Sequence, residues 1–146
     1  MNVLVWLAEG TWPAATDAAA RLAPPEARIT LLYVNDPALA GEVSGAWTGL
    51  MGRGHHDPGP AVAAAAEAAG LDMAAAAAKR VGRTAGISTR RGPAEREVVA
   101  ACLEHDADLL VVARDGDRSR PGPRSLGRQT RFVVDHAPCQ VLLIWP

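Results

Sequence analysis

The sequence predicts a doubly wound α/β fold built on a parallel sheet of five strands. Short apolar runs alternate along the chain with longer, alanine-rich segments, and this alternation is typical of repeated βαβ units. One run, ADLLVVA at residues 107–113, is apolar almost throughout, as expected for a strand that helices cover on both faces. A chain of 146 residues has the size of one ordinary domain, so we expect a single domain over residues 1–146.

Turn-forming residues and helix signals bound the expected elements. The first helix begins near Thr11 and has Pro13 in its first turn, where a missing N–H costs nothing, and Pro24 ends it. The second helix is long and alanine-rich, with Gly70 as a weak point inside it. The expected strands span residues 3–8, 28–34, 86–90, 107–113 and 140–145, and the expected helices span residues 11–22, 61–80, 93–105 and 127–136.

Charge, apolar run length and cysteine content argue against several classes of function. The net charge is −1, so nothing favours a nucleic acid or an anionic membrane surface as partner. The apolar runs fall short of the ~20 residues that span a bilayer, and MNVLVWLAEG lacks the basic start and cleavage site of a signal peptide. The two cysteines, Cys102 and Cys139, form neither a disulfide framework nor a metal-binding spacing, which favours the reducing cytoplasm.

Residues 35–60 form the longest stretch without a helix or strand pattern, and they are rich in glycine. A loop of this length inside a domain is either mobile or functional. It contains His55 and His56 next to Asp57, but adjacent residues rarely converge on one metal ion. We interpret residues 41–60 as a glycine-rich surface loop and predict no metal site.

The third and fifth expected strands differ in how well their composition suits the edge of a sheet. The third, GISTR, is polar, as an exposed edge requires. The fifth, QVLLIW, is apolar and has no helix after it to cover it, so an unpaired edge there would promote aggregation. We therefore expect a homodimer through the last strand, with an interface formed by Val141, Leu142, Leu143, Ile144 and Trp145.

Three segments, in order along the chain, carry a resemblance to a known family. They are ARITLLYVNDP (27–37), GPAEREVVAACLEHDADLLVVARDG (92–116) and HAPCQVLLI (136–144). Together they resemble the universal stress protein family over essentially the whole chain. The resemblance implies a sheet in the order 3-2-1-4-5, of the adenine nucleotide alpha hydrolase-like type, and it agrees with dimerisation through the last strand.

The implied nucleotide site lies where the connections from strands one and four leave on opposite faces of the sheet, because ligands of doubly wound sheets bind at that point. Family members that bind ATP carry glycines after strand four, which let backbone N–H groups approach phosphate oxygens at the start of the last helix. In this sequence Gly116 and Gly127 match the second and third glycines, whereas Ala113 replaces the first. The residues that the resemblance assigns to the phosphates are Gly116, Gly127, Arg128, Gln129 and Thr130.

The end of the first strand departs further from the family pattern, which is Asp-Gly-Ser at this point. Without a gap, Ala8 falls at the aspartate, whereas one inserted residue would place Glu9, Gly10 and Thr11 at the three positions of this pattern. The ungapped alignment preserves the apolar face of the following helix better, so we favour it, and a polar contact to the nucleotide is then missing. Val34, at the end of the second strand, is implied to line the base pocket.

Arg128 separates two hypotheses, because it stands where the family has a small hydroxyl residue. Its guanidinium either reaches the phosphates as a charge-assisted donor or fills the volume that they need. The first case predicts a cytoplasmic, homodimeric stress-response protein that binds ATP or AMP, with or without Mg²⁺. Efficient catalysis is not expected, since the chain has neither a Walker lysine motif nor a kinase catalytic loop. The second case predicts a dimeric interaction module with a closed pocket, and a slow ATPase is the weakest alternative.

Overall fold

Five parallel strands form one sheet in the spatial order β3-β2-β1-β4-β5. The computed structural model describes residues 1–38, 59–114 and 126–146. The fold class and the strand order are as expected, and the boundaries lie within two residues of the predicted ones. The elements are β1 (Asn2–Leu7), α1 (Trp12–Leu22), β2 (Arg28–Asn35), α3 (Gly59–Arg80), β3 (Ala85–Arg91), α4 (Ala94–Glu104), β4 (Leu109–Ala113), α5 (Arg128–His136) and β5 (Gln140–Ile144).

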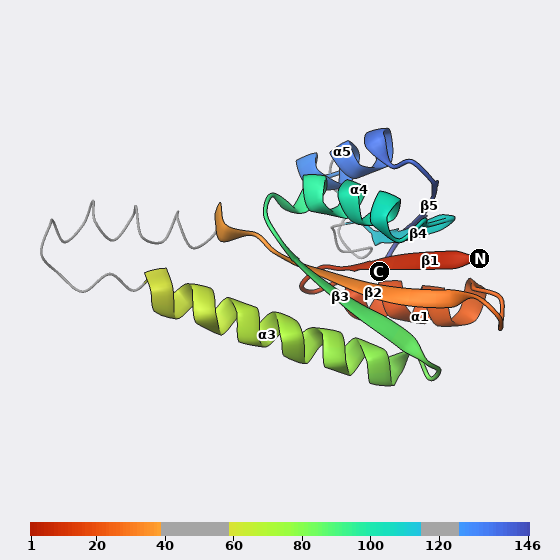
Figure 1. Ribbon diagram of the computed structural model, residues 1–146, viewed down its shortest axis with the longest axis horizontal. Coiled ribbons are helices and arrows are strands. Elements are labelled where there is room, and N and C mark those ends of the chain that lie inside the picture. Colours follow the sequence, from red (N-terminus) through yellow and green to blue (C-terminus); the bar gives the residue numbers. More distant parts are fainter. Residues whose placement is uncertain (39–58, 115–125) are drawn as a thin grey trace, which may run out of the picture.

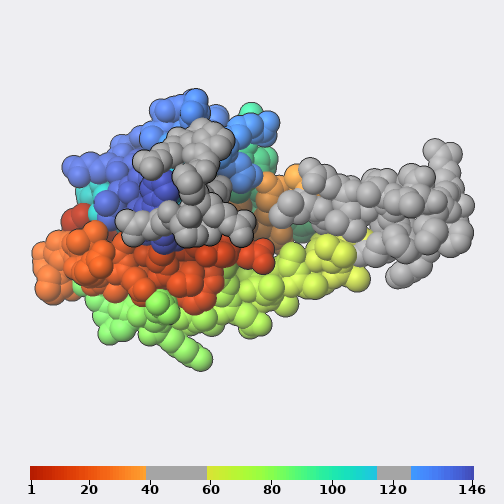
Figure 2. All heavy atoms as spheres, turned by 180° about the vertical axis from the view of Figure 1, so that it is seen from behind, coloured from red at the N-terminus to blue at the C-terminus, as the bar shows by residue number. Residues whose placement is uncertain are grey.

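The helices form a layer on each face of the sheet, with α1 and α3 on one face and α4 and α5 on the other (Figure 1). The space-filling view from behind shows the N-terminal part of the chain as a band between α3 and the C-terminal residues (Figure 2). This three-layer arrangement is the doubly wound architecture. It leaves β1 and β4 in the middle of the sheet and β3 and β5 at its edges.

The apolar residues of β1 alternate between the two helical layers. Val3 and Val5 belong to the core cluster that contains α1 and α3 residues, whereas Leu4 and Trp6 belong to the cluster that contains α4 and α5 residues. Successive side chains of a strand point to opposite faces, so a central strand covered on both faces must be apolar at every position. This is the physical reason for the uninterrupted run VLVWL.

Gly70 has a packing role in α3 that the sequence did not reveal. A Cβ atom at this position would lie 1.9 Å from the ring of Tyr33 in β2. The Tyr33 hydroxyl donates a hydrogen bond to the carbonyl of Ala66, at 3.1 Å. Gly70 was expected to weaken the helix, but the structure shows that it makes room for the side chain that attaches α3 to the sheet.

Helix α3 is also long and apolar enough, by length and composition alone, to cross a membrane. No such segment was expected from the lengths of the apolar runs, and the difference arises because alanines give an 18-residue window a mean hydropathy of 1.3 despite the charges near it. The helix buries Ala74 and Ala77 in the core cluster of the α1 and α3 layer. This packing accounts for the apolar composition of its inner face.

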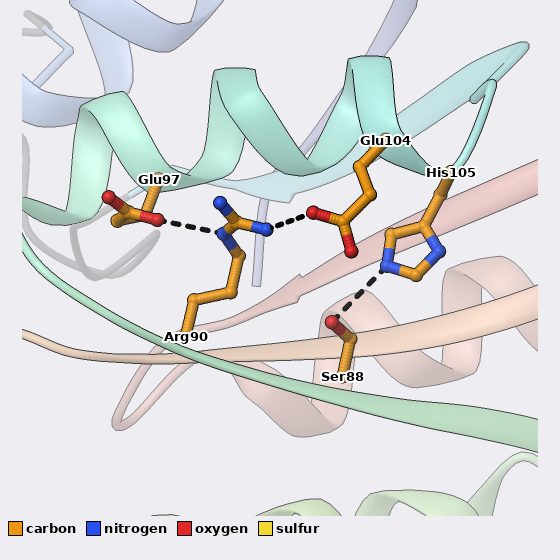
Figure 3. A network of polar contacts seen from close by, with 5 residues as sticks. All are labelled: Ser88, Arg90, Glu97, Glu104 and His105. Atoms are coloured by element: carbon orange, nitrogen blue, oxygen red, sulfur yellow. Dashed lines mark hydrogen bonds and ion pairs between the residues drawn. The ribbon is translucent and has the colours of Figure 1, made fainter.

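A network of charged and polar side chains ties the edge strand β3 to α4 (Figure 3). Arg90 donates from Nε to Glu97 at 2.8 Å and from Nη1 to Glu104 at 2.5 Å. Along the same strand, the Ser88 hydroxyl and Nε2 of His105 lie 3.2 Å apart. The ring of His105, at the end of α4, therefore reaches across to the sheet.

Candidate functional site

The candidate site lies at the carboxyl ends of β1, the central strand, and its neighbour β4. They pair in parallel, with Val3 opposite Leu109 and Val5 opposite Val111. Helix α1 follows β1 on one face of the sheet, and α5 follows β4 along the chain and packs on the other face. The connections that follow β1 and β4 therefore lead to opposite faces of the sheet, as expected, and α1 and α5 both begin near this edge.

The turn after β1 brings the predicted residues Ala8, Glu9 and Gly10 to this edge. The Ala8 carbonyl accepts the N–H groups of Thr11 at 3.2 Å and of Trp12 at 2.9 Å. Gly10 has φ 77°, and a Cβ there would meet no atom within 4 Å. The glycine is needed for its left-handed backbone rather than for space. Glu9 and Gly10 are both exposed, so this turn is open to solvent.

The start of α5 presents the predicted phosphate-binding residues. Gly127 is the N-cap and, as a glycine, has no side chain to accept an N–H group of the first turn. Among the described residues, no side chain caps this end of the helix, and a helix N-terminus of this kind suits an anion. Arg128 and Gln129 are exposed, whereas Thr130 is buried. Gly116, the other predicted glycine, lies outside the described residues. The structure thus brings Gly127 to Thr130 together as one helix N-terminus.

Ala113 and Val34 lie in the two different core layers. Ala113, the last residue of β4, is 7% exposed and packs in the cluster with α1 and α3 residues. Val34 is 9% exposed and packs in the cluster with α4 and α5 residues. Both side chains therefore belong to the core beneath the edge where Glu9 and Gly10 are exposed.

Sequence reasoning missed Arg114, the residue that directly follows β4. Its N–H donates to the carbonyl of Ile144 at 3.0 Å, and its guanidinium stacks on the ring of Trp145, with the Cζ atom 3.6 Å from the ring centroid. The Nε atom of Arg114 and the Nε1 atom of Trp145 are buried and have no hydrogen-bond partner among the described residues. Trp145, predicted at a dimer interface, thus makes a cation–π contact within its own chain.

A cavity of about 160 Å³ lies beside the candidate site, at the carboxyl ends of β2 and β3. Tyr33, Thr89 and Arg91 line it from the strands, and Glu67 lines it from α3. Burial, followed by the charges of Glu67 and Glu9, raises the pKa of Tyr33 above its usual value of 10.0.

The apolar last strand lies at an edge of the sheet, where the strand order implied by the resemblance places it. Within the described chain β5 pairs only with β4, and its register sets Val111 opposite Leu142. Leu143 is 39% exposed, and Val141, Leu142, Ile144 and Trp145 are half-buried. The outer edge of β5 therefore presents unpaired backbone groups together with apolar side chains.

The fold is similar to that of several solved universal stress proteins. The protein UspA from Lactobacillus plantarum is 26% identical, with a TM-score of 0.62 over 99% of this chain and 97% of that one. An Arabidopsis thaliana universal stress protein family protein with AMP bound is 18% identical, with a TM-score of 0.64 over 99% and 91%. A universal stress protein in complex with cAMP is also 18% identical, with a TM-score of 0.60 over 99% and 96%.

A comparison with curated proteins finds no match for this sequence. The sequence model of the universal stress protein family, however, matches residues 2–144, which include every described strand and helix. The strand order, the divergence of the chain at β1 and β4 and this match agree with one another. The chain therefore belongs to the universal stress protein family.

Proposed function

We propose that this protein is a cytoplasmic, homodimeric stress-response protein that binds an adenine nucleotide without efficient catalysis. The nucleotide, ATP or AMP with or without Mg²⁺, lies at the carboxyl ends of β1 and β4. The single observation that carries the proposal is the N-terminus of α5 at this edge, where the N-cap is a glycine and no side chain of the described residues caps the helix. A helix N-terminus presents backbone N–H groups and the positive end of a helix dipole, the two features that favour phosphate binding.

The residues divide between the two ends of the nucleotide. The phosphates contact the backbone of Gly127, Arg128 and Gln129, and the base lies toward Glu9 and the end of β2. The structures of relatives with AMP and with cAMP support adenine nucleotides as the ligand class. Gly116 and the hydroxyl of Thr130 complete the proposed phosphate site.

Arg128 contributes a charge to this site. Its side chain is exposed, so it is free to turn toward a phosphate group and does not fill the space beneath the helix. A guanidinium–phosphate pair is a charge-assisted contact, and it would replace the small hydroxyl donor of other family members. The arginine therefore favours ligands with at least one phosphate over free adenosine.

Thermal melting with nucleotide tests the proposal. We expect ATP and AMP to raise the melting temperature in a saturable way and adenosine to have a smaller effect, because a ligand that binds only the native state stabilises it. Arg128→Ser should weaken the effect, whereas Arg131→Ser, an exposed arginine of the same helix, should leave it unchanged. No shift with millimolar ATP or AMP overturns the proposal, and a shift that appears only in Arg128→Ser shows that the arginine blocks the pocket.

An interaction module is the second candidate function, and one observation favours it. Leu143 exposes 39% of its surface at an unpaired strand edge, which offers a site for another strand. In that case the partner strand is the physiological ligand and the pocket has no role. Light scattering on the protein without nucleotide measures this association: a dimer at micromolar concentration supports the edge as an interface, and a monomer rejects the homodimer.

A further inference from the structure

The cavity at the carboxyl ends of β2 and β3 lies on the face of the sheet that α3 covers. Tyr33 points toward this helix, where its hydroxyl donates to the carbonyl of Ala66. Side chains two residues apart in a strand share a face, so Asn35 lies on the same face as Tyr33. The register sets Thr89 opposite Tyr33 and Arg91 opposite Asn35. These four residues, from two neighbouring strands, therefore form the sheet side of the cavity.

Helix α3 supplies the opposite side of the cavity, with Glu67 and Leu71. The two residues are four apart, so they lie on one face of the helix, one turn from each other. Both are exposed, and Leu71 exposes 50% of its surface. Gly70, next to Leu71, lets the Tyr33 ring approach the helix. The helix therefore adds one carboxylate and one apolar side chain to a cavity whose other side is polar.

Opposite charges line this cavity without pairing with each other. Glu67 and Arg91 lie on its two sides, and neither takes part in an ion pair among the described residues. Arg90, the neighbour of Arg91, differs, because it turns to the other face of the sheet and contacts two glutamates of α4 (Figure 3). The carboxylate of Glu67 and the guanidinium of Arg91 are thus available to a ligand that lies between them.

The volume of the cavity limits what it can hold. It measures about 160 Å³, which is below the roughly 300–1,000 Å³ of pockets for drug-sized ligands. A small organic molecule fits, whereas a nucleotide does not fit within it, and the charge of Glu67 would also repel phosphate groups. A ligand with a single charge would satisfy one side of the cavity and leave the opposite charge without a partner.

We propose that this cavity binds a small zwitterion, a molecule such as an amino acid that carries one ammonium and one carboxylate. The carboxylate of the ligand pairs with Arg91, whose guanidinium can donate two parallel hydrogen bonds to it. The ammonium pairs with Glu67, and the apolar part of the ligand lies on Leu71. Asn35, opposite Arg91 in the register, adds an amide donor beside the carboxylate.

This site is separate from the proposed nucleotide site and does not rest on that proposal. The phosphates are assigned to the start of α5, which follows β4 along the chain, whereas the cavity belongs to β2 and β3 on the other side of β1. Arg128→Ser should therefore leave zwitterion binding unchanged, even where it changes nucleotide binding.

A titration followed by NMR tests the proposal on the intact protein, at neutral pH and constant ionic strength and without nucleotide. The main probe is 4-aminobutyrate, and glycine and 6-aminohexanoate carry the same two charges at shorter and longer spacing. Butyrate and butylamine are matched controls with only the anionic or only the cationic group. With roughly seven non-hydrogen atoms, the main probe should bind in the millimolar range. We expect saturable shifts of the amide signals of Thr89 and Arg91, and an affinity about 10-fold above that of either control.

Two variants assign the charges. Arg91→Gln should reduce the affinity for 4-aminobutyrate to that for butylamine, and Glu67→Gln should reduce it to that for butyrate, because each variant removes the partner of one charged group. Arg28→Gln and Glu26→Gln are the matched controls. They remove the same charges at exposed positions near the amino end of β2, and they should leave the affinity unchanged.

Three outcomes would overturn the proposal. The first is the absence of a saturable shift with all three zwitterions, and the second is equal affinity for 4-aminobutyrate and either single-charge control. The third is an equal loss of affinity in Arg28→Gln or Glu26→Gln, which would show an effect of net charge rather than of the cavity. The comparison of probes on the wild type remains decisive if a variant fails to fold.

Discussion

The two edge strands, β3 and β5, each have a neighbouring strand on only one side in the described sheet, but they differ in the side chains that they carry. Strand β3 is polar, and on one face its Arg90 is held by two glutamates of α4. Strand β5 is apolar, exposes Leu143, and has an arginine–tryptophan stack just beyond its carboxyl end. Unpaired strand edges promote association, so the charged side chains of β3 protect its edge, whereas β5 is suited to pairing with another strand.

The difference shows that exposure of an apolar residue is not enough to identify an interface. Ile87 of β3 is 49% exposed and Leu143 of β5 is 39% exposed, so exposure alone would point to the wrong edge. The neighbouring side chains distinguish them, because Ile87 is followed along its strand by Ser88, Thr89 and two arginines. A partner strand at β3 would have to remove these polar groups from water, which costs free energy.

The largest expected effect comes from placing a charge on the apolar edge. Leu143→Arg should weaken homodimerisation on the order of 100-fold, because two buried guanidinium groups would face each other across a two-fold interface. Analytical ultracentrifugation over a dilution series measures the change. Ile87→Arg, the matched substitution on the other edge, should leave the association unchanged, and equal weakening by both variants would contradict the assignment of the interface to β5.

A smaller effect is expected from removing the charge network of β3. Arg90→Met should lower the free energy of unfolding by about 1 kcal/mol, since the arginine side chain is 23% exposed and contacts two carboxylates. Urea denaturation measures this loss, which should shrink at high salt. Arg91→Met, the exposed neighbour on the opposite face of the strand, should change stability by less than about 0.5 kcal/mol. A larger loss from Arg91→Met would mean that the Arg90 contacts contribute little.

Tyr33 reports directly on the contact between β2 and α3, because it is the only tyrosine in the chain. Its pKa is raised in the folded state by burial and by Glu67. The resulting stabilisation is fully present below the ordinary pKa of 10.0 and is lost as the pH rises through the folded value. Absorbance titration should show the raised pKa, and Gly70→Ala, which displaces the ring, should lower it. An unchanged titration in Gly70→Ala would show that the ring does not pack on this glycine.

The smallest effect is expected at the exposed ion pair between α1 and α3. Arg80 donates to Asp17 at 2.6 and 2.7 Å, and this contact lowers the pKa of Asp17 below 3.8. The stabilisation is therefore present above pH 4 and is lost as the pH falls through the folded pKa. Asp17→Asn should be slightly less stable than the wild type at pH 6, and the difference should be smaller at pH 2. Denaturation at both pH values checks this, and a constant difference would exclude titration of Asp17 as its cause.

Part of the candidate site could be predicted from the sequence, and part could not. Gly127 and the exposed Arg128 lie at a helix start as expected, because the glycine followed by a helical pattern is a local signal. The contact of Arg114 with Trp145 has no local signal, since the two residues approach only when β5 pairs with β4.

The sequence by itself determined the number, type and approximate bounds of the described strands and helices, because apolar periodicity and proline and glycine positions act over a few residues. It also marked β5 as an apolar strand in need of a partner. Tertiary structure alone decided that Gly70 admits the Tyr33 ring, that Arg114 stacks on Trp145 and that Arg90 contacts two carboxylates of α4. Each of these contacts joins different helices, strands or loops, and only the folded sheet brings them within reach of one another.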